Sequence, residues 1–331
     1  MFDFIHIGMG KCLSTSLQTL WARSDNYNYA SGSQIQIAVE KIIKEVNDAA
    51  IINQLRRLQF SLSSDDGLHD QEKPSILSCE GFTFTLFENP SLDVYIPNKQ
   101  QAISKGLLAH TKNILIIIRD PLHWIKSAHS QMIKQGGCLS LLDMSEKRHD
   151  AITGNLNLSY ILDIWSQNGA KITVLPMEIF SENREEFWNI YESHLNVARP
   201  TKNGAVQNAH SNVSNYNTLK THQSLNALLK EIERRFHAVE FPEKEMCLKA
   251  TNILRVWGTR RALETADGDD VEALNIYLNE SYLQDYEHDK LDVNRELKQK
   301  ISDHFISAIP DEDYISAFDI KNRYREALWK N

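Results

Sequence analysis

The chain has 331 residues, enough to bury a sizeable core as one large domain or two modest ones. Hydrophobic residues make up 42% and charged residues 24%, which is ordinary for a globular protein. A net charge of −8 argues against a general nucleic-acid binder, because such proteins usually carry a basic excess. No stretch approaches the roughly twenty apolar residues that span a bilayer, so the sequence predicts no integral membrane segment.

The cysteines and histidines suggest no metal centre. The four cysteines are widely spaced and form no C-x-x-C pair, which argues against a zinc site and against a disulfide framework. None of the twelve histidines belongs to an H-x-x-x-H or H-E-x-x-H pair. Because reduced thiols are the default in the cytoplasm and the start of the sequence lacks a signal-peptide pattern, we expect a cytoplasmic protein.

The first twenty residues have the order of an anion-binding loop. An apolar strand expected over residues 3–7 runs into two glycines and a lysine, and a helix is expected from about 13 to 23. The glycines allow a tight turn, and the N–H groups and dipole of the helix start attract a phosphate or sulfate. An ordinary strand-to-helix turn with a Ser or Thr cap is the alternative. The residues assigned to the anion site are Gly10, Lys11, Cys12, Leu13, Ser14, Thr15 and Ser16.

This loop differs from the phosphate loop G-x-x-x-x-G-K-[ST] of nucleotide hydrolases. Gly10 and Lys11 fit its last glycine and its lysine. Ile5 stands where its first glycine would be, and Cys12 where its hydroxyl residue would be. Without that hydroxyl, a nucleotide-bound magnesium ion loses its usual protein ligand. The sequence therefore disfavours an ordinary ATP or GTP hydrolase.

The segment resembles the phosphate loop of the sulfotransferases that use 3′-phosphoadenosine-5′-phosphosulfate (PAPS). Their first strand and loop commonly read H-I-G-x-P-K-[ST]-G-[ST]-[ST]-S-L-Q. The chain matches this pattern from His6 to Gly8, at Lys11, and from Ser14 to Gln18. The resemblance implies that the backbone amides of residues 10–16 hold the 5′-phosphosulfate, and that Lys11 neutralises the charge growing on the leaving phosphate.

Three loop residues depart from the sulfotransferase pattern. Gly10 replaces the usual proline, Cys12 the usual hydroxyl residue, and Leu13 the usual glycine. The leucine has the largest expected effect, because its side chain would crowd the phosphosulfate or hinder a left-handed backbone.

A second element follows a buried strand. Residues 114–118 are an uninterrupted aliphatic run, as expected of a strand covered on both faces of a parallel sheet, and Arg119 comes directly after it. A helix is expected over residues 122–134, and Ser127 lies eight residues after Arg119. The sulfotransferases carry a similar R-[DN]-P element with a serine at this spacing. The resemblance implies that Arg119 and Ser127 hold the 3′-phosphate of PAPS. A salt-bridged arginine at a strand end is the alternative.

A third element places a carboxylate at a strand end. Residues 75–79 read as a short apolar strand, and Glu80 follows it. Bacterial relatives of the sulfotransferase fold often show a similar S-S-E, so the resemblance implies that Glu80 is the general base. A glutamate that caps or salt-bridges the next helix is the alternative.

Weaker resemblances concern the scaffold. Tyr160, Trp165 and a strand expected over residues 171–175 resemble the Y-x4-W and V-L-P-x-E elements of the family, and we predict a structural role for Glu178. The polar segment 208–215 is similar to an N-x-S segment of bacterial members. It either approaches the nucleotide or only forms a loop.

Strands that alternate with helices predict an α/β fold. We expect a three-layer, doubly wound parallel sheet that opens with a phosphate-loop-like strand, turn and helix. Residues 1–216 are expected to form this core, with a helical insertion at about 30–70, and residues 217–331 a mainly helical region packed on it. The other predicted elements are an exposed loop at 61–74 and helices near 97–110, 140–148, 157–168 and 183–195.

Together these features predict a PAPS-dependent sulfotransferase that moves a sulfuryl group to a hydroxyl of an acceptor. Glu80 is the predicted base, 3′,5′-phosphoadenosine the product, and no metal is required. The resemblance implies a carbohydrate or glycolipid acceptor, and the net charge of −8 indicates no nucleic-acid partner. The sequence carries no signal for the oligomeric state. Two alternatives stay open: an atypical nucleotide or sugar kinase, and a non-catalytic nucleotide-binding member of the fold.

Overall fold

The computed structural model divides the chain into two compact units, which are described separately. The first unit consists of Met1–Trp124, Asp150–Ala209 and Arg295–Lys330, and most of the second consists of Ile125–His149 and His210–Asn294. The structure describes residues 2–30, 41–42, 47–57, 72–83, 95–201, 216–239, 243–258 and 293–330.

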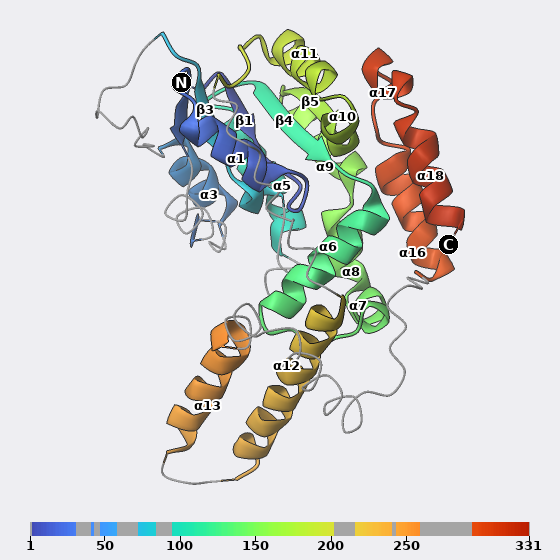
Figure 1. The fold of residues 1–331 in the computed structure, drawn as a ribbon. Helices are drawn as coiled ribbons and strands as arrows, with labels where there is room; N and C mark the ends of the chain where they lie inside the picture. The colour runs from blue at the N-terminus through green and yellow to red at the C-terminus, as the bar shows by residue number, and fades with distance from the viewer. Residues whose placement is uncertain are drawn as a thin grey trace. The chain divides into compact units, whose positions relative to one another are not determined.

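The first unit contains a five-stranded parallel sheet with the order β2-β3-β1-β4-β5, most of which Figure 1 labels. Within the sheet, Ile5 is level with Leu77 on one side and with Ile114 on the other. All five aliphatic residues of the run 114–118 are buried, as their pattern predicts. The strands are β1 (Phe4–His6), β2 (Asn28–Ala30), β3 (Ser75–Ser78), β4 (Asn113–Ile118) and β5 (Lys171–Pro176).

Helices cover both faces of this sheet. On one face, Phe4 of β1 makes edge-to-face ring contacts with Trp21 of α1 (Ser14–Arg23) and with Tyr191 of α11 (Arg184–Leu195). Helix α5 (Tyr95–Leu107) lies in the connection from β3 to β4, which crosses the sheet in the direction opposite to the connection from β1 to β2 through α1. Because such crossovers are right-handed, α5 lies on the other face of the sheet from α1. There α5 packs against α9 (Leu158–Gln167). The predicted three-layer, doubly wound fold is therefore confirmed.

Strand β5 is an edge strand of the sheet, and the last helices of the chain reach this edge through Tyr314. The hydroxyl of Tyr314 donates a hydrogen bond of 2.8 Å to the carbonyl of Val174, which satisfies an acceptor at that edge. The helices are α16 (Arg295–Ile301), the π-helical turn η3 (Ser302–Ile306), α17 (Asp313–Ala317) and α18 (Ile320–Lys330). These helices belong to the first unit. The predicted domain boundary after residue 216 adjoins residues 202–215, which lie outside the described part, so this boundary stays a prediction.

The predicted helical insertion is described in part. Helix α3 (Asp48–Arg56) packs on α5, where a Cβ atom on Gly106 would lie 2.6 Å from the Cβ of Leu55, so only glycine permits this approach. The predicted loop at 61–74 lies mostly outside the described residues. The remaining helices are α8 (His149–Asn155), which belongs to the first unit from Asp150 on, and α10 (Met177–Glu182). Neither had a counterpart in the sequence interpretation.

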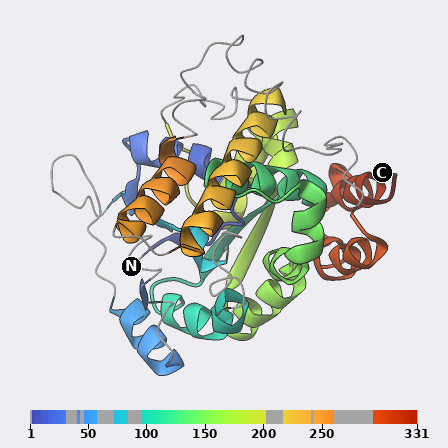
Figure 2. The ribbon, with the colours of Figure 1, turned by 90° about the horizontal axis from the view of Figure 1, so that it is seen from below.

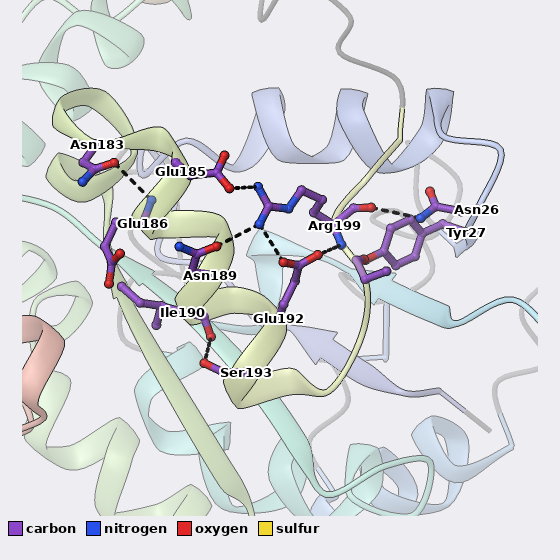
Figure 3. A network of polar contacts seen from close by, with 11 residues as sticks. Asn26, Tyr27, Asn183, Glu185, Glu186, Asn189, Ile190, Glu192, Ser193 and Arg199 are labelled. Carbon is purple, nitrogen blue, oxygen red and sulfur yellow. Dashed lines mark hydrogen bonds and ion pairs between the residues drawn. The ribbon is translucent and has the colours of Figure 1, made fainter.

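A polar network fixes the segment that follows α11 (Figure 3). The guanidinium of Arg199 donates to Glu185, Asn189 and Glu192 on that helix at 2.7 to 2.9 Å, and its backbone N–H donates to Glu192 as well. The hydrogen bonds from Arg199 hold the pKa of Glu192 below its usual value. Because Asn26 donates to the carbonyl of Arg199, the network also reaches the turn before β2.

The second unit is helical where it is described. Helix α6 (Pro121–Lys134) starts in the first unit and ends in the second, where Asn226 of α12 donates to the carbonyls of Ile133 and Gly137 at 2.8 and 2.9 Å. These bonds hold the C-terminal end of α6, where the N–H of Gly136 also donates to the Ile133 carbonyl at 3.0 Å. Helices α12 and α13 run side by side (Figure 2). The other bounds are α7 (Leu141–Lys147), α12 (Tyr216–His237), α13 (Lys244–Ile253) and the π-helical turn η2 (Leu254–Gly258).

No helix in the described ranges combines the length and apolar character needed to cross a membrane.

Candidate active site

The strand order brings the three predicted loops to one edge of the sheet. Strand β1 lies between β3 and β4, and all three run parallel, so their carboxyl ends are neighbours. The chain leaves β1 toward β2 and leaves β4 toward β5, in opposite directions. In open α/β sheets, such a reversal creates the crevice in which ligands bind.

The loop after β1 has an unusual backbone. Gly8, Lys11 and Leu13 all have positive φ, at 64°, 70° and 66°. The sequence suggested that leucine at position 13 would hinder a left-handed backbone, but the structure places Leu13 in that conformation. For a non-glycine residue this costs roughly 1–2 kcal/mol. The loop therefore reaches its shape in spite of the leucine and at an energetic cost.

Two backbone N–H groups at the start of α1 are available to an anion. Leu13 is the N-cap residue, makes no side-chain cap bond, and accepts the N–H groups of Ser16 and Leu17 at 3.0 and 3.1 Å. The N–H groups of Ser14 and Thr15 have no acceptor among the residues that the structure describes. Together with the positive end of the helix dipole, these groups form an anion-binding surface.

Side-chain donors hold the carbonyls of the loop. The indole N–H of Trp124 donates to Gly10 at 2.7 Å, Arg119 Nη1 donates to Lys11 at 3.2 Å, and Thr83 Oγ1 donates to Ile7 at 2.9 Å. In a trans peptide the N–H points opposite to the carbonyl. The amide of Lys11 therefore points away from the Trp124 indole, and each such bond fixes the direction of the following N–H group.

Removing the strain at Leu13 gives a measurable prediction. Leu13→Gly and Leu13→Ala both delete the leucine side chain, but only glycine adopts a positive φ without a Cβ penalty. We expect the glycine variant to have a free energy of unfolding about 1 kcal/mol higher than that of the alanine variant. Urea unfolding of the pair measures this difference. An alanine variant as stable as the glycine variant would show that the loop is not left-handed at this position in solution.

Cys12 is a packing residue in this loop. Its side chain is fully buried, its Sγ lies 3.7 Å from the Gly10 carbonyl, and burial raises the pKa of its thiol well above the usual value. A thiol with a raised pKa is a poor nucleophile at neutral pH. The structure therefore gives Cys12 no nucleophilic role.

Glu80 lies directly against the loop. It begins the short 3-10 helix η1 (Glu80–Phe82) after β3, and its side chain is partly exposed. A Cβ atom built on Gly8 would lie 3.2 Å from both the Cα and the Cγ of Glu80. Glycine at position 8 therefore provides both the positive φ and the room that this carboxylate-bearing residue needs.

His6 links the two central strands to α1. Its Nδ1 lies 2.8 Å from Ser78 Oγ, which also accepts a hydrogen bond from Gln18 at 3.0 Å. The ring is fully buried, and burial lowers the pKa of His6 to about 3. His6 is thus a neutral core histidine with a hydrogen-bond partner on β3.

The buried His6 predicts a loss of stability in acid. Because its pKa is about 3 in the folded chain and 6.5 when unfolded, the unfolded state binds the proton first as pH falls below 6.5. The stabilisation is complete above pH 6.5 and is lost progressively toward pH 3. Between pH 7 and pH 5 this amounts to about 2 kcal/mol of unfolding free energy.

Urea unfolding of wild type, His6→Gln and His304→Gln at the two pH values tests this. His304 is exposed, so its variant should keep the full acid loss while His6→Gln loses about 2 kcal/mol less. If His6→Gln does not fold, NMR titration of the wild type decides, and a His6 ring that protonates above pH 5 would contradict the prediction.

Arg119 and Asp120 form the turn after β4. Arg119 is partly exposed and contacts the loop through the Lys11 carbonyl. The carboxylate of Asp120 accepts the N–H of His123 at 2.9 Å, which caps α6, and its own N–H donates to Glu178 Oε1 at 2.9 Å. The second oxygen of Glu178 accepts the Tyr324 hydroxyl. Both oxygens of Glu178 are thus engaged in the scaffold, in line with its predicted role.

The structure brings most of the predicted site residues together. Within the first unit, the loop residues from Gly10 to Ser16, Glu80 and Arg119 lie at the carboxyl edge of the central strands. Ser127 lies on α6 in the second unit, so its part in the site stays a prediction. The segment 208–215 lies outside the described residues.

Sequence reasoning missed three residues that shape the site: Thr83, Trp124 and Tyr324. Trp124 and Tyr324 are almost fully buried, and each acts through one polar atom. In a sequence they look like ordinary aromatic core residues. Thr83 had no signal apart from its place three residues after Glu80.

The described residues contain no cluster of three or more metal-ligating side chains. A hollow of about 260 Å³ lies at the opposite, amino edge of β4 and β5 and is separate from the candidate site. It is lined by Arg56, Lys105, Leu108, Ala109, Lys112 and Asn168. Arg56 and Lys105 lie in the last turns of α3 and α5, where their positive charges complement the helix dipoles.

Comparison with known proteins gives one distant structural likeness to report. No family model matches the chain, and no curated protein matches it significantly. A crystal structure of a sulfotransferase from Alicyclobacillus acidocaldarius aligns with a TM-score of 0.43 and 14% sequence identity. The alignment covers 79% of this chain and 99% of that chain.

Proposed function

We propose that the chain is a sulfotransferase that takes its sulfuryl group from PAPS. The observation that carries the proposal is the meeting of two strand ends. Arg119, after β4, donates a hydrogen bond to the carbonyl of Lys11 in the loop after β1. A cationic side chain on each loop, beside the N–H groups of α1, suits a ligand with two phosphate groups.

The proposed reaction joins the acceptor oxygen to sulfur. The acceptor hydroxyl attacks the sulfuryl group, its proton passes to Glu80, and the bond from sulfur to the 5′-phosphate oxygen breaks. The products are a sulfate ester and 3′,5′-phosphoadenosine. Lys11 stabilises the negative charge on the departing phosphate, so preorganised charge replaces the metal ion of phosphoryl transfer.

The two phosphate groups of the donor are assigned to different elements. The N–H groups of Ser14 and Thr15 hold the 5′-phosphosulfate, with the loop hydroxyls as further donors. Arg119 holds the 3′-phosphate, with Ser127 as its predicted partner. A hydroxyl of a carbohydrate or glycolipid is the proposed acceptor class, and a cytoplasmic location the proposed setting.

Ligand-dependent melting tests the proposal. We expect 3′,5′-phosphoadenosine to raise the melting temperature without a metal, since a ligand at 100 times its Kd adds about 2.7 kcal/mol of stability. ATP with magnesium should do so less. Protection by ATP–magnesium alone would support the kinase alternative. Protection by 3′,5′-phosphoadenosine without turnover on any hydroxyl acceptor would support the non-catalytic alternative.

Replacing Arg119 gives the matching mutational prediction. Arg119→Ala removes a charge-assisted contact worth about 1.5–3 kcal/mol, so the Kd for 3′,5′-phosphoadenosine should rise by about 10- to 100-fold. Isothermal titration calorimetry measures it. Arg56→Ala is the control, because Arg56 is an exposed arginine at the amino edge of the sheet. Unchanged binding in Arg119→Ala would remove Arg119 from the site.

A further inference from the structure

A line of partly buried polar contacts runs from the last helix of the chain to the candidate site. Tyr324 of α18 is only 2% exposed, and its hydroxyl donates to one carboxylate oxygen of Glu178. The other oxygen of Glu178 accepts the N–H of Asp120 at 2.9 Å. Asp120 directly follows Arg119, whose guanidinium contacts the Lys11 carbonyl. One carboxylate therefore links α18 to the peptide unit that carries Arg119.

We propose that Tyr324 and Glu178 are positioning residues for Arg119, and that they set the preference of the site for nucleotides with a 3′-phosphate. This inference rests on the proposed function, because it assigns the 3′-phosphate to Arg119. Neither residue touches the nucleotide in this proposal. They act by fixing the backbone from which the arginine projects.

The chemistry of the pair suits a fixed support. Burial, with the carboxylate of Glu178 beside it, raises the pKa of Tyr324 far above its usual value. The tyrosine hydroxyl therefore stays protonated and keeps donating at any physiological pH. Glu178 is half-buried, and a carboxylate in such a place that loses a donor carries a desolvation cost. Without the Tyr324 hydroxyl, Glu178 is expected to shift toward other partners and to loosen its hold on the Asp120 N–H group.

Helix α18 is attached to the rest of the first unit by more than one contact, and the effect of the Tyr324–Glu178 hydrogen bond must be distinguished from a general loosening of this helix. The same helix is tied to α10 by a second contact, in which Arg323 donates to both carboxylate oxygens of Glu182. This ion pair lies closer to the surface, with Arg323 41% exposed, and lowers the pKa of Glu182. The hydrogen bonds of Arg323 go to Glu182, and Arg323 interacts with Glu178 only through a weaker attraction between their charges. Arg323→Gln therefore weakens the attachment of the helix while leaving the Tyr324–Glu178 contact in place.

The experiment measures a ratio of affinities in the full chain. For each variant, calorimetry gives the Kd for adenosine 5′-phosphate divided by the Kd for 3′,5′-phosphoadenosine. Tyr324→Phe should reduce this 3′-phosphate preference by about tenfold. Arg323→Gln should leave it within about twofold, although both variants lower the melting temperature. A purely structural role for Tyr324 would lower the melting temperature and leave the ratio unchanged.

A second pair of variants keeps the inference testable if Tyr324→Phe does not fold. The Glu178→Gln variant retains a side-chain oxygen for the Asp120 N–H and offers an amide N–H to the Tyr324 oxygen, so it should keep most of the preference. Glu178→Ala should lose it.

Each outcome decides one question. An equal change of the ratio in Tyr324→Phe and Arg323→Gln, or no change in Tyr324→Phe, overturns the positioning role while the proposed function stands. If Tyr324→Phe does not fold, equal affinity ratios in Glu178→Ala and Glu178→Gln likewise overturn the positioning role. A wild type that shows no 3′-phosphate preference overturns the proposed function and this inference together.

Discussion

Replacing Glu80 by glutamine is expected to lower the rate of sulfuryl transfer by about a hundredfold to ten-thousandfold. Glutamine has almost the same size as glutamate but cannot accept the acceptor's proton. The Kd for 3′,5′-phosphoadenosine should change little, because Glu80 is assigned to the acceptor and not to the donor. Single-turnover assays with labelled PAPS measure the rate, and calorimetry measures the binding.

The contact between Glu80 and Gly8 makes this variant well suited to the test. The Cα and Cγ atoms that pack on the glycine are the same in glutamate and glutamine, so the loop is preserved. Glu312→Gln, at an exposed position, is the matched control. If turnover survives in Glu80→Gln, another group takes the proton.

Replacing Lys11 by methionine is expected to lower the rate by on the order of a hundredfold to a thousandfold, the usual cost of losing one preorganised donor of charge stabilisation. Methionine keeps the length and the apolar stem of lysine. It also keeps the Cβ atom, so the cost of the positive φ at this position is unchanged between the two proteins. The rate loss therefore reports the missing charge and not a rearranged loop.

The control for Lys11→Met is Lys105→Met, at the exposed amino edge of the sheet. It removes the same charge from the protein as a whole, so it accounts for any effect of net charge on the binding of an anionic donor. The rate in Lys105→Met should stay within about twofold of the wild type. If the rate in Lys11→Met also stays within that range, Lys11 does not stabilise the transition state.

The sequence predicts the central strands and their loops well because their signals are local. The aliphatic run at 114–118 has the composition of a doubly covered strand, and the structure places it in β4, between β1 and β5. The order of strand, glycines, lysine and helix at the N-terminus likewise predicts β1, the loop and α1. Parallel strands that end in the same direction then bring Glu80 and Arg119 to one edge.

The features that the sequence does not predict depend on distant contacts. Strand β2 has only three residues, Asn28 to Ala30, and forms because β3 offers it a partner. The left-handed backbone of Leu13 is imposed by the contacts on either side of it and opposes the preference of leucine. The bond from Tyr324 to Glu178 joins residues 146 positions apart. No spacing rule covers such a pair.

The arrangement of the first unit has a consequence for synthesis on the ribosome. This unit unites Met1–Trp124 with Arg295–Lys330, so the helices over Arg295–Lys330 are synthesised later than Met1–Trp124 by roughly tens of seconds. Until then the edge of β5 lacks the cover that Tyr314 later provides. Exposed strand edges pair readily with other chains. The β5 edge of the nascent chain is therefore open to pairing with other chains during that interval, and a chaperone bound there would protect it.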